Sequence, residues 1–450
     1  MRQHSVDSAE YFVARNGAVG CGDLHTSPIN TNSTVALQRL ALYLSPIALQ
    51  GEFRPMCPWA ECTSCAHDTT STLTHASVVT SLGATFRYAV ARCVADAGTV
   101  AVSFSGGIDS LAVLWNLDRY CRSSSRRLIA ITANLVDDEG QHSKDIAARQ
   151  IASLGIKCEH VVVNVADALS WPPWTPAGPR LDAMPEVNSA INECARLTGA
   201  AVLLTGEGAD ELLGCPRFIG PALVRHNRSD VPQYMADVGR QSLWKELLAA
   251  LSRLLPRSPR QLLYWVANWP EMCSTEPYPV LSQRFRESVR HWGAQWLRHQ
   301  VTSDMCAQPW SLADAYYSRH PWDPLPPAGP IPTASPFLDP IFVRRSEAIP
   351  VWERYAATLS SSYHRRKSVI LGFLPPEAAA VIPRQKQIFT QAFIRYQERW
   401  PRHAPVSTSL GLIDSTALRS CDDPSVLLQV RAIEHWLRYC VDVGYRIVDS

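Results

Sequence analysis

Hydrophobic and polar positions follow two different patterns along the chain. Between about residues 78 and 220, short apolar runs alternate with segments in which apolar residues recur every three or four positions. The short runs predict buried strands and the longer segments predict helices. The predicted strands are 100–104, 128–133, 159–165 and 201–204, and the predicted helices are 78–95, 110–120, 143–154 and 187–197. Because strands and helices alternate, this part is expected to form an α/β fold, a doubly wound parallel sheet with helices on both faces.

The rest of the chain differs from this region on both sides. Residues 230–320 are rich in Leu, Trp, Arg and Ala at helical spacing, a Pro-dense stretch follows at 320–336, and helical patterns resume, for example at 425–436. Near the other end, residues 35–44 predict short strands among Ser, Thr, Asn, Pro and Cys. We therefore expect three parts: an N-terminal segment at 1–75, a nucleotide-binding core at 76–220, and a helical, substrate-side region at 221–450.

A glycine turn joins the first predicted strand to its helix. The apolar run ends in Ser105-Gly106-Gly107, and the helical pattern begins at Ser110. Two glycines allow a tight turn, and the unpaired N–H groups of a helix start attract anions. Asp109 would repel a phosphate unless Mg2+ lay between them. The spacing is neither that of a Walker loop nor Gly-x-Gly-x-x-Gly. The turn predicts a pyrophosphate site; the alternative is an ordinary strand-to-helix connection.

A second loop combines acids and glycines directly after the last predicted strand. It reads Thr205-Gly-Glu207-Gly-Ala-Asp210-Glu-Leu-Leu-Gly214. In open parallel sheets, ligands bind beyond the carboxyl ends of strands where the strand order reverses. If the first and fourth strands are neighbours there, Asp109 and Asp210 could share one Mg2+, and Glu207 could orient or deprotonate an amine. The alternative, an acidic cap on the next helix, accounts for Asp210 but not for the Gly-Glu-Gly run.

Composition narrows the classes of partner. The chain has 450 residues, 46% of them hydrophobic, and a net charge of +2. This length allows several domains with a buried core, and the charge gives no reason to expect nucleic acid. The sequence has no apolar run long enough to span a membrane, and its first residues lack the apolar core of a signal peptide. We therefore expect a cytoplasmic protein without a membrane partner.

Cysteine and lysine usage each single out a short segment. Thirteen cysteines at irregular spacing indicate reduced thiols rather than a disulfide framework. Four soft ligands stand close together, Cys57, Cys62, Cys65 and His67, and either a zinc site or a cysteine-rich loop fits this spacing. Only five lysines accompany thirty-eight arginines. A lysine inside a motif is therefore informative.

Four segments, in fixed order, carry a resemblance to a known family. They are Ser105–Ser110, Gly206–Glu211, Pro336-Phe-Leu-Asp339 and Arg384-Gln-Lys386-Gln-Ile-Phe389. Together they resemble the synthetase domain of the asparagine synthetase family, which includes β-lactam synthetases and the cyclases that close lasso-peptide macrolactams. The similarity covers about residues 78–440. It implies the ATP pyrophosphatase (PP-loop) fold, adenylation of a carboxylate by MgATP, and attack of an amine that yields an amide and AMP.

The resemblance also implies roles for individual residues. Pyrophosphate and nucleotide would be held by Ser105, Gly106, Gly107, Asp109, Ser110, Gly206 and Asp145, and Mg2+ by Asp109 and Asp210. The resemblance implies catalytic roles for Lys386, Glu207 and Lys367. Lys367 belongs to His364-Arg-Arg-Lys367-Ser-Val-Ile, which is similar to the helix before the family's active-site lysine. For Lys386, the alternative is a solvated helix residue.

Two departures from the family pattern bear on the substrate. Full asparagine synthetases carry a glutaminase domain with Cys directly after Met, whereas Arg2 follows Met1 here. We therefore expect that the chain does not release ammonia from glutamine. Residues 1–75 are expected to be the remnant of a glutaminase domain. Asparagine synthetases also continue the acidic loop with Gly-Gly-Tyr, where this chain has Gly214-Cys-Pro-Arg-Phe218. Proline removes a backbone donor there.

The second departure favours the peptide-cyclising and natural-product branch. The expected substrates are then a small-molecule or peptide carboxylate and amine, with a leader peptidase as a candidate partner protein. One alternative is an asparagine synthetase that uses ammonia or a partner glutaminase. Another is a non-catalytic nucleotide-binding protein on the same scaffold.

Overall fold

The computed structural model describes eleven stretches of the chain. They are residues 34–45, 81–94, 97–164, 179, 184–239, 243–268, 276–302, 304–319, 329–398, 400 and 402–449. The Cys57, Cys62, Cys65 and His67 cluster lies outside these residues. Among the described helices, none combines the length and apolar character needed to cross a bilayer.

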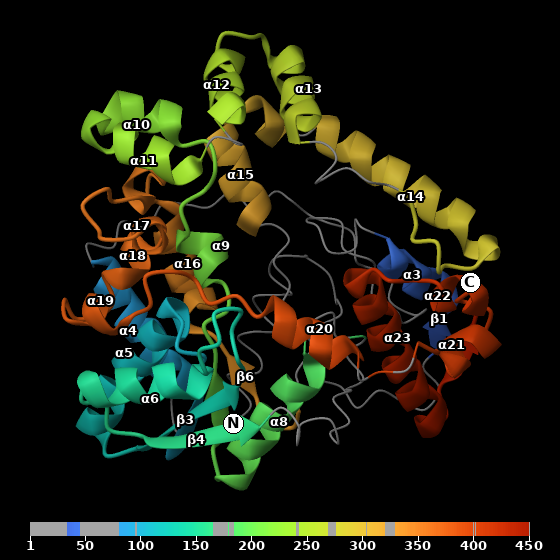
Figure 1. Ribbon diagram of the computed structural model, residues 1–450, viewed down its shortest axis with the longest axis horizontal. Helices are drawn as coiled ribbons and strands as arrows, with labels where there is room; N and C mark the ends of the chain where they lie inside the picture. The colour runs from blue at the N-terminus through green and yellow to red at the C-terminus, as the bar shows by residue number, and fades with distance from the viewer. Residues whose placement is uncertain are drawn as a thin grey trace.

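A five-stranded, fully parallel sheet lies among the helices of the fold (Figure 1). Its strands are β2 (Thr99–Ser103), β3 (Arg127–Asn134), β4 (Glu159–Asn164), β5 (Val202–Leu204) and β6 (Thr333–Ala334). The order is β4-β3-β2-β5-β6. Strands β3 and β4 are added on one side of β2, and β5 and β6 on the other, so the strand order reverses between β2 and β5. The predicted fold class is confirmed, and the first and fourth predicted strands are neighbours. The two-residue edge strand β6 was not predicted.

Alternate residues of each strand pack against different helices. On one face, Val100 and Val102 join a core with α4 (Leu82–Val94), α5 (Ile108–Ser124) and α6 (Ser143–Ser153). On the other, Ala101 packs with α8 (Pro185–Leu197). Because both faces are covered at the centre of the sheet, β2 is buried from Val100 to Val102 and β5 along its whole length, rather than alternating. The edge strand β4 has no fully buried residue. The carboxyl ends of the strands remain at one edge of the sheet for the loops of the site.

Helices dominate after residue 205, and the helical region predicted for residues 221–450 is part of this stretch. Their bounds are α9 (Ala209–Leu213), α10 (Gly220–His226), α11 (Val231–Val238), α12 (Leu243–Ser252), α13 (Arg257–Asn268), α14 (Gln283–Thr302), α15 (Trp310–Arg319), α16 (Pro340–Glu347), α17 (Ser362–Arg366), α18 (Ser368–Leu371), α19 (Ala378–Val381), α20 (Thr390–Glu398), α21 (Pro405–Ser409), α22 (Ser415–Arg419) and α23 (Pro424–Val443). In Figure 1, α17, α18 and α19 lie beside α4 and α5, whereas α21, α22 and α23 form a separate group. The segment between α19 and α20 crosses from one group to the other.

The short strands expected at 35–44 are only partly present. Strand β1 (Thr34–Ala36) pairs in parallel with β7 (Arg446–Val448), and α3 (Leu37–Ala41) follows at once. Leu37, Leu40 and Leu44 recur at helical spacing, and all three are buried in a core that contains Trp436 of α23. The strand prediction for this stretch is wrong because its apolar residues have the helical period, not the period of two.

Candidate active site

The turn after β2 has the conformation that its glycines allow. Gly106 has φ +82°, and a Cβ placed on it would lie 3.1 Å from Cγ2 of Ile146 on α6. Gly107 then stands at the start of α5 in extended conformation, without a side-chain cap. The first N–H groups of α5 are therefore directed to the carboxyl edge of the sheet, where helix geometry favours an anion.

Two serine hydroxyls close this loop through long hydrogen bonds. Ser110 Oγ accepts from the Ser105 N–H at 3.3 Å and donates to the Gly107 carbonyl at 3.1 Å. Ser105 Oγ lies 3.1 Å from Ser110 Oγ and accepts from the Gly107 N–H at 3.3 Å. All four distances exceed the usual hydrogen-bond length, so these donors can transfer to a stronger acceptor at small cost.

The acidic loop after β5 touches the glycine turn directly. A Cβ on Gly206 would lie 3.0 Å from the Ser110 nitrogen and 3.1 Å from Cβ of Asp109. Only glycine allows this approach, and it brings together segments nearly a hundred residues apart. Gly208, with φ +82°, then begins α9, which carries Asp210 in its first turn.

The Pro336-Phe-Leu-Asp339 motif and the two residues before it contact the acidic loop, with the Leu338 side chain against Gly208. The Thr205 N–H donates to the Ala334 carbonyl at 2.9 Å, and Ser335 Oγ donates to the Glu207 carbonyl at 2.6 Å. Asp339 caps α16 by accepting from the Ile341 N–H at 2.9 Å, and it pairs with an arginine of α4. These contacts position the acidic loop.

Four charged side chains from distant segments meet at these loops. Lys367 Nζ donates to both carboxylate oxygens of Asp109 at 2.7 Å and also pairs with Asp210. Lys386 Nζ lies 3.5 Å from Oδ2 of Asp210. The side chain of Lys367 is 6% exposed, whereas that of Lys386 is 67% exposed. The four formal charges cancel, with one ammonium buried and the other open to solvent.

Four consecutive residues at the end of the short helix α17, residues 364–367, contact different parts of the site. His364 lies with Nε2 3.1 Å from the Pro383 carbonyl, at the start of the segment that bears Lys386. Arg365 donates to both carboxylate oxygens of Asp237 at 2.7 Å and so ties α17 to α11. The Arg366 carbonyl accepts from the first N–H after Gly214 at 3.1 Å. At Lys367 the backbone breaks between α17 and α18, and the ammonium enters the carboxylate pair.

Burial and charge compete for the pKa values of this cluster. Burial raises the pKa of Asp109 above its ordinary value, more than Lys367 lowers it. Burial acts in the same direction on Asp210, but Lys367 and then Lys386 outweigh it and hold its pKa below the ordinary value. For Lys367, burial alone would lower the pKa, yet Asp109 and Asp210 raise it above 10.5. Lys367 is therefore an ammonium at neutral pH.

The loop after β3 holds the segment that carries Lys386. The Asp138 N–H donates to the Ile388 carbonyl at 2.8 Å, and the Gln391 N–H donates to Asp138 Oδ1 at 2.9 Å. Asp137 accepts from Gln387 at 3.3 Å. The sequence analysis missed both aspartates. Their signal was the same as that of the acidic loop after β5: acids directly following a buried strand.

Other predicted residues lie around this cluster. Glu207 is partly buried, and its carbonyl is held by Ser335. Asp145 is exposed in the first turn of α6, adjacent to the residue that covers Gly106, and it is not a member of the four-charge cluster. Tyr363 was not predicted. Burial and then the charge of Asp109 raise its pKa to about 12.

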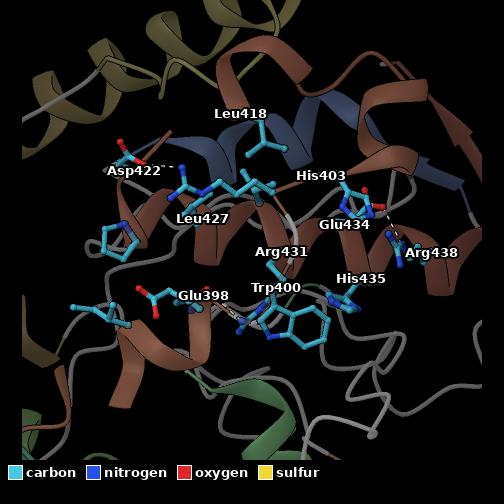
Figure 2. Close-up of a pocket in the computed structure, with 15 residues that line it drawn as sticks. Glu398, Trp400, His403, Leu418, Asp422, Leu427, Arg431, Glu434, His435 and Arg438 are labelled. Carbon is cyan, nitrogen blue, oxygen red and sulfur yellow. Dashed lines mark hydrogen bonds and ion pairs between the residues drawn. The ribbon is translucent and has the colours of Figure 1, made fainter. Parts of the chain in front are cut away.

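A separate cavity of about 510 Å³ lies between α20 and α23 (Figure 2). Its cations are neutralised by acids: Arg438 pairs with Glu434 at 2.9 Å and Arg402 with Asp422 at 2.7 Å. Burial, followed by two neighbouring arginines, lowers the pKa of His435 to about 4, so this imidazole is neutral. Without excess positive charge, the cavity is a poor site for a polyphosphate.

Comparison with known proteins decides the family. Residues 81–409, most of the chain, match the model of the family described as asparagine synthase. The chain belongs to the asparagine synthase family. It is thus a member of a family of ATP-dependent ligases that form C–N bonds. Among the described residues of this family member, no group of three or more His, Cys, Asp or Glu side chains converges as a metal site.

The remaining comparisons add little to the family match. A solved structure, "U34-tRNA thiolase NcsA from Methanococcus maripaludis with its [4Fe-4S] cluster", is 18% identical, with a TM-score of 0.24. The alignment covers 60% of this chain and 80% of that chain. No curated protein sequence matches this chain.

Proposed function

We propose that this asparagine synthase family member adenylates a substrate carboxylate with MgATP and then joins it to an amine, releasing AMP. One observation carries the proposal. Asp109 and Asp210, from two separate loops, converge on Lys367 beside the open N-terminus of α5. Anion-binding N–H groups, paired carboxylates and a second, exposed lysine are the groups that cleavage between α and β phosphates requires.

The carboxylate pair fits the proposed Mg2+. Both groups supply oxygen ligands, which Mg2+ prefers, and they face a turn suited to phosphate. When bound, Mg2+ would neutralise charge on the leaving pyrophosphate. Lys367 now occupies the position between the two carboxylates, so we propose that its ammonium moves onto phosphate oxygen when the carboxylates bind the metal. Its raised pKa keeps the ammonium charged for that role.

Lys386 is the group best placed to contact substrate. Its side chain is 67% exposed and only 3.5 Å from Asp210, while the segment around it is anchored by Asp138 and His364. A fixed backbone and an accessible ammonium suit stabilisation of negative charge that develops on the α-phosphate and at the reacting carbonyl. Ser105, Ser110 and the Gly206 turn would hold pyrophosphate, and Glu207 would orient the amine.

The segment after the acidic loop supports a substrate other than the small amino acid used by an asparagine synthetase. Phe218 has φ +63° and a buried ring whose centroid lies 5.3 Å from that of Trp310 in the helical core. The Cys215 N–H is already bonded to Arg366. This segment therefore offers neither an aromatic ring nor that backbone donor to a small amino acid. Closure of a macrolactam, with the amine on the substrate itself, is the form of the reaction we propose.

The test is ATP–pyrophosphate exchange with candidate acids, combined with detection of AMP. Exchange that requires a precursor peptide, followed by a product lighter by one water, supports the cyclase. Exchange with aspartate and none with peptides contradicts it and supports the asparagine synthetase alternative, with ammonia or a partner glutaminase. If no acid supports exchange although ATP binds, the chain is a non-catalytic nucleotide-binding protein.

Asp109→Ala provides the control for the site itself. Without this carboxylate, one of the two proposed metal ligands and a partner of Lys367 are lost together, so exchange should fall by at least about a thousandfold. Normal turnover in Asp109→Ala would contradict the metal assignment. Arg87→Ala, at an exposed position on α4, should leave exchange unchanged.

A further inference from the structure

The hairpin formed by α12 and α13 exposes a row of large apolar side chains. We call it the hairpin stripe: Trp244 (48% exposed), Leu247 (66%), Leu251 (57%), Leu254 (82%), Leu262 (57%) and Val266 (62%). Positions 247, 251 and 254 follow helical spacing, so they lie on one face of α12 and its end. Large apolar side chains that gather on the exposed side of one hairpin mark an interaction site more often than a chance feature.

The hairpin does not expose these residues for lack of a core. Its opposite side is packed, with Ala249, Tyr264 and Trp265 buried against Trp296 and Trp310. The hairpin therefore has two apolar sides. The packed side anchors it to the protein, and the hairpin stripe faces outward. Figure 1 shows the hairpin at the outer margin of the molecule, with the connection between α12 and α13 outermost.

The exposed charged side chains of the hairpin are all cationic. Between residues 243 and 268 the ionisable side chains are Lys245, Glu246, Arg253, Arg257 and Arg260, apart from a buried tyrosine. Glu246 is 4% exposed and accepts from the hydroxyl of Tyr234 at 2.6 Å. Arg253 and Arg257 are exposed on either side of Leu254 at the tip. The outward surface therefore combines leucines with cations and shows no exposed acid.

We propose that the tip of this hairpin docks on an anionic phospholipid bilayer and lies in its headgroup region. A convex apolar tip suits a planar, deformable surface, and the flanking cations complement negatively charged headgroups. No spanning helix is needed. The proposal departs from the expectation of no membrane partner, which considered spanning segments alone, and it is independent of the proposed catalytic function.

The test is co-sedimentation of the full chain with vesicles. Vesicles containing phosphatidylglycerol should bind the protein, pure phosphatidylcholine vesicles should bind it at least tenfold more weakly, and high salt should release it. Arg253→Glu and Arg257→Glu should each weaken binding by about fivefold or more. The triple variant Leu247→Ser, Leu251→Ser and Leu254→Ser should reduce it at least tenfold. Leu197→Ser, at a leucine that is 69% exposed on α8, and Arg87→Glu on α4 are the matched controls.

Several results would overturn the proposal. These are absence of binding to anionic vesicles, and equal losses in hairpin and control variants. A smaller mass in light scattering for the triple variant would assign the stripe to a second copy of the chain. A lower unfolding midpoint for that variant would instead assign the stripe to another segment of this chain. ATP–pyrophosphate exchange measured without vesicles should be unchanged in every variant, which separates this proposal from the proposed function.

Discussion

Two regions of the molecule deliver a lysine to the same aspartate, and they do so in opposite ways. The junction of α17 and α18 buries Lys367, which contacts Asp109 at 2.7 Å and Asp210 as well. The segment between α19 and α20 leaves Lys386 67% exposed, 3.5 Å from Asp210 alone. One ammonium is enclosed between two carboxylates, and the other is already exposed to solvent.

This difference shows how equal charges acquire different roles. A buried ammonium must be compensated by nearby carboxylates, because an uncompensated charge in a low dielectric is strongly destabilising. Lys367 therefore holds the two loops in register as part of the folded structure. An exposed ion pair contributes little to stability, so Lys386 can leave Asp210 for substrate at small cost. The predictions below separate these roles.

The largest effect expected from changing either lysine is on activity, from Lys386→Met. Loss of a preorganised cation at the reacting centre should reduce the rate by about 10²–10³-fold, while the urea unfolding midpoint stays the same. Steady-state kinetics and urea denaturation measure the two quantities. Lys386→Arg, which keeps the charge, should retain more activity than Lys386→Met. A clear loss of stability in Lys386→Met would show that both lysines are structural.

Lys367→Met should act on stability as well as activity. Breaking a buried ion pair costs about 3–5 kcal/mol, and the 43% exposure of the Asp210 side chain lowers our expectation to about 2–3 kcal/mol. Urea unfolding of the variant measures this loss. Adding Asp210→Asn to Lys367→Met should recover part of it, because the repulsion between the two carboxylates is removed. An unchanged unfolding free energy in the single variant would contradict the structural role of Lys367.

A change in the spacing of the loops should have a smaller effect. Gly206→Ala places a Cβ 3.0 Å from the Ser110 backbone, so the acidic loop must shift, at about 1–3 kcal/mol of stability. Exchange activity should fall too, since Asp210 moves relative to Asp109. Gly98→Ala is the matched control because its Cβ would meet nothing within 4 Å. Equal behaviour of the two variants would show that the loops tolerate separation.

The smallest expected effect is a pH dependence at the alkaline end. The folded-state pKa of Lys367 lies above the unfolded value of 10.5, so its stabilising contribution is complete below pH 10.5. That contribution is lost as pH rises through the folded-state pKa. The difference in unfolding free energy between wild type and Lys367→Met should therefore be flat from pH 8 to 10 and shrink above that range. A difference that shrinks between pH 8 and 10 would mean that the carboxylates do not raise this pKa.

Most of the sheet followed from the sequence because its signals are local. Apolar runs ending in glycine and acidic residues located β2 and β5, and the same signals marked the turn at Gly106 and the acidic loop at Gly206. Strand β6 escaped because two residues carry no periodicity. The helix at 37–41 departs from the predicted strands because Leu37, Leu40 and Leu44 follow the helical period.

The sequence by itself determined which residues are fit for the chemistry: a glycine turn, two aspartates after buried strands, and a lysine in a lysine-poor chain. Tertiary structure alone decided how they are paired. Lys367 and Asp109 are 258 positions apart, and nothing in either local pattern says which lysine is buried between the carboxylates. That choice depends on α17 being held at once by Asp237, the end of α9 and Pro383. Long-range contacts of this kind form only when the whole chain has folded, because the residues that make them have no short-range preference for one another.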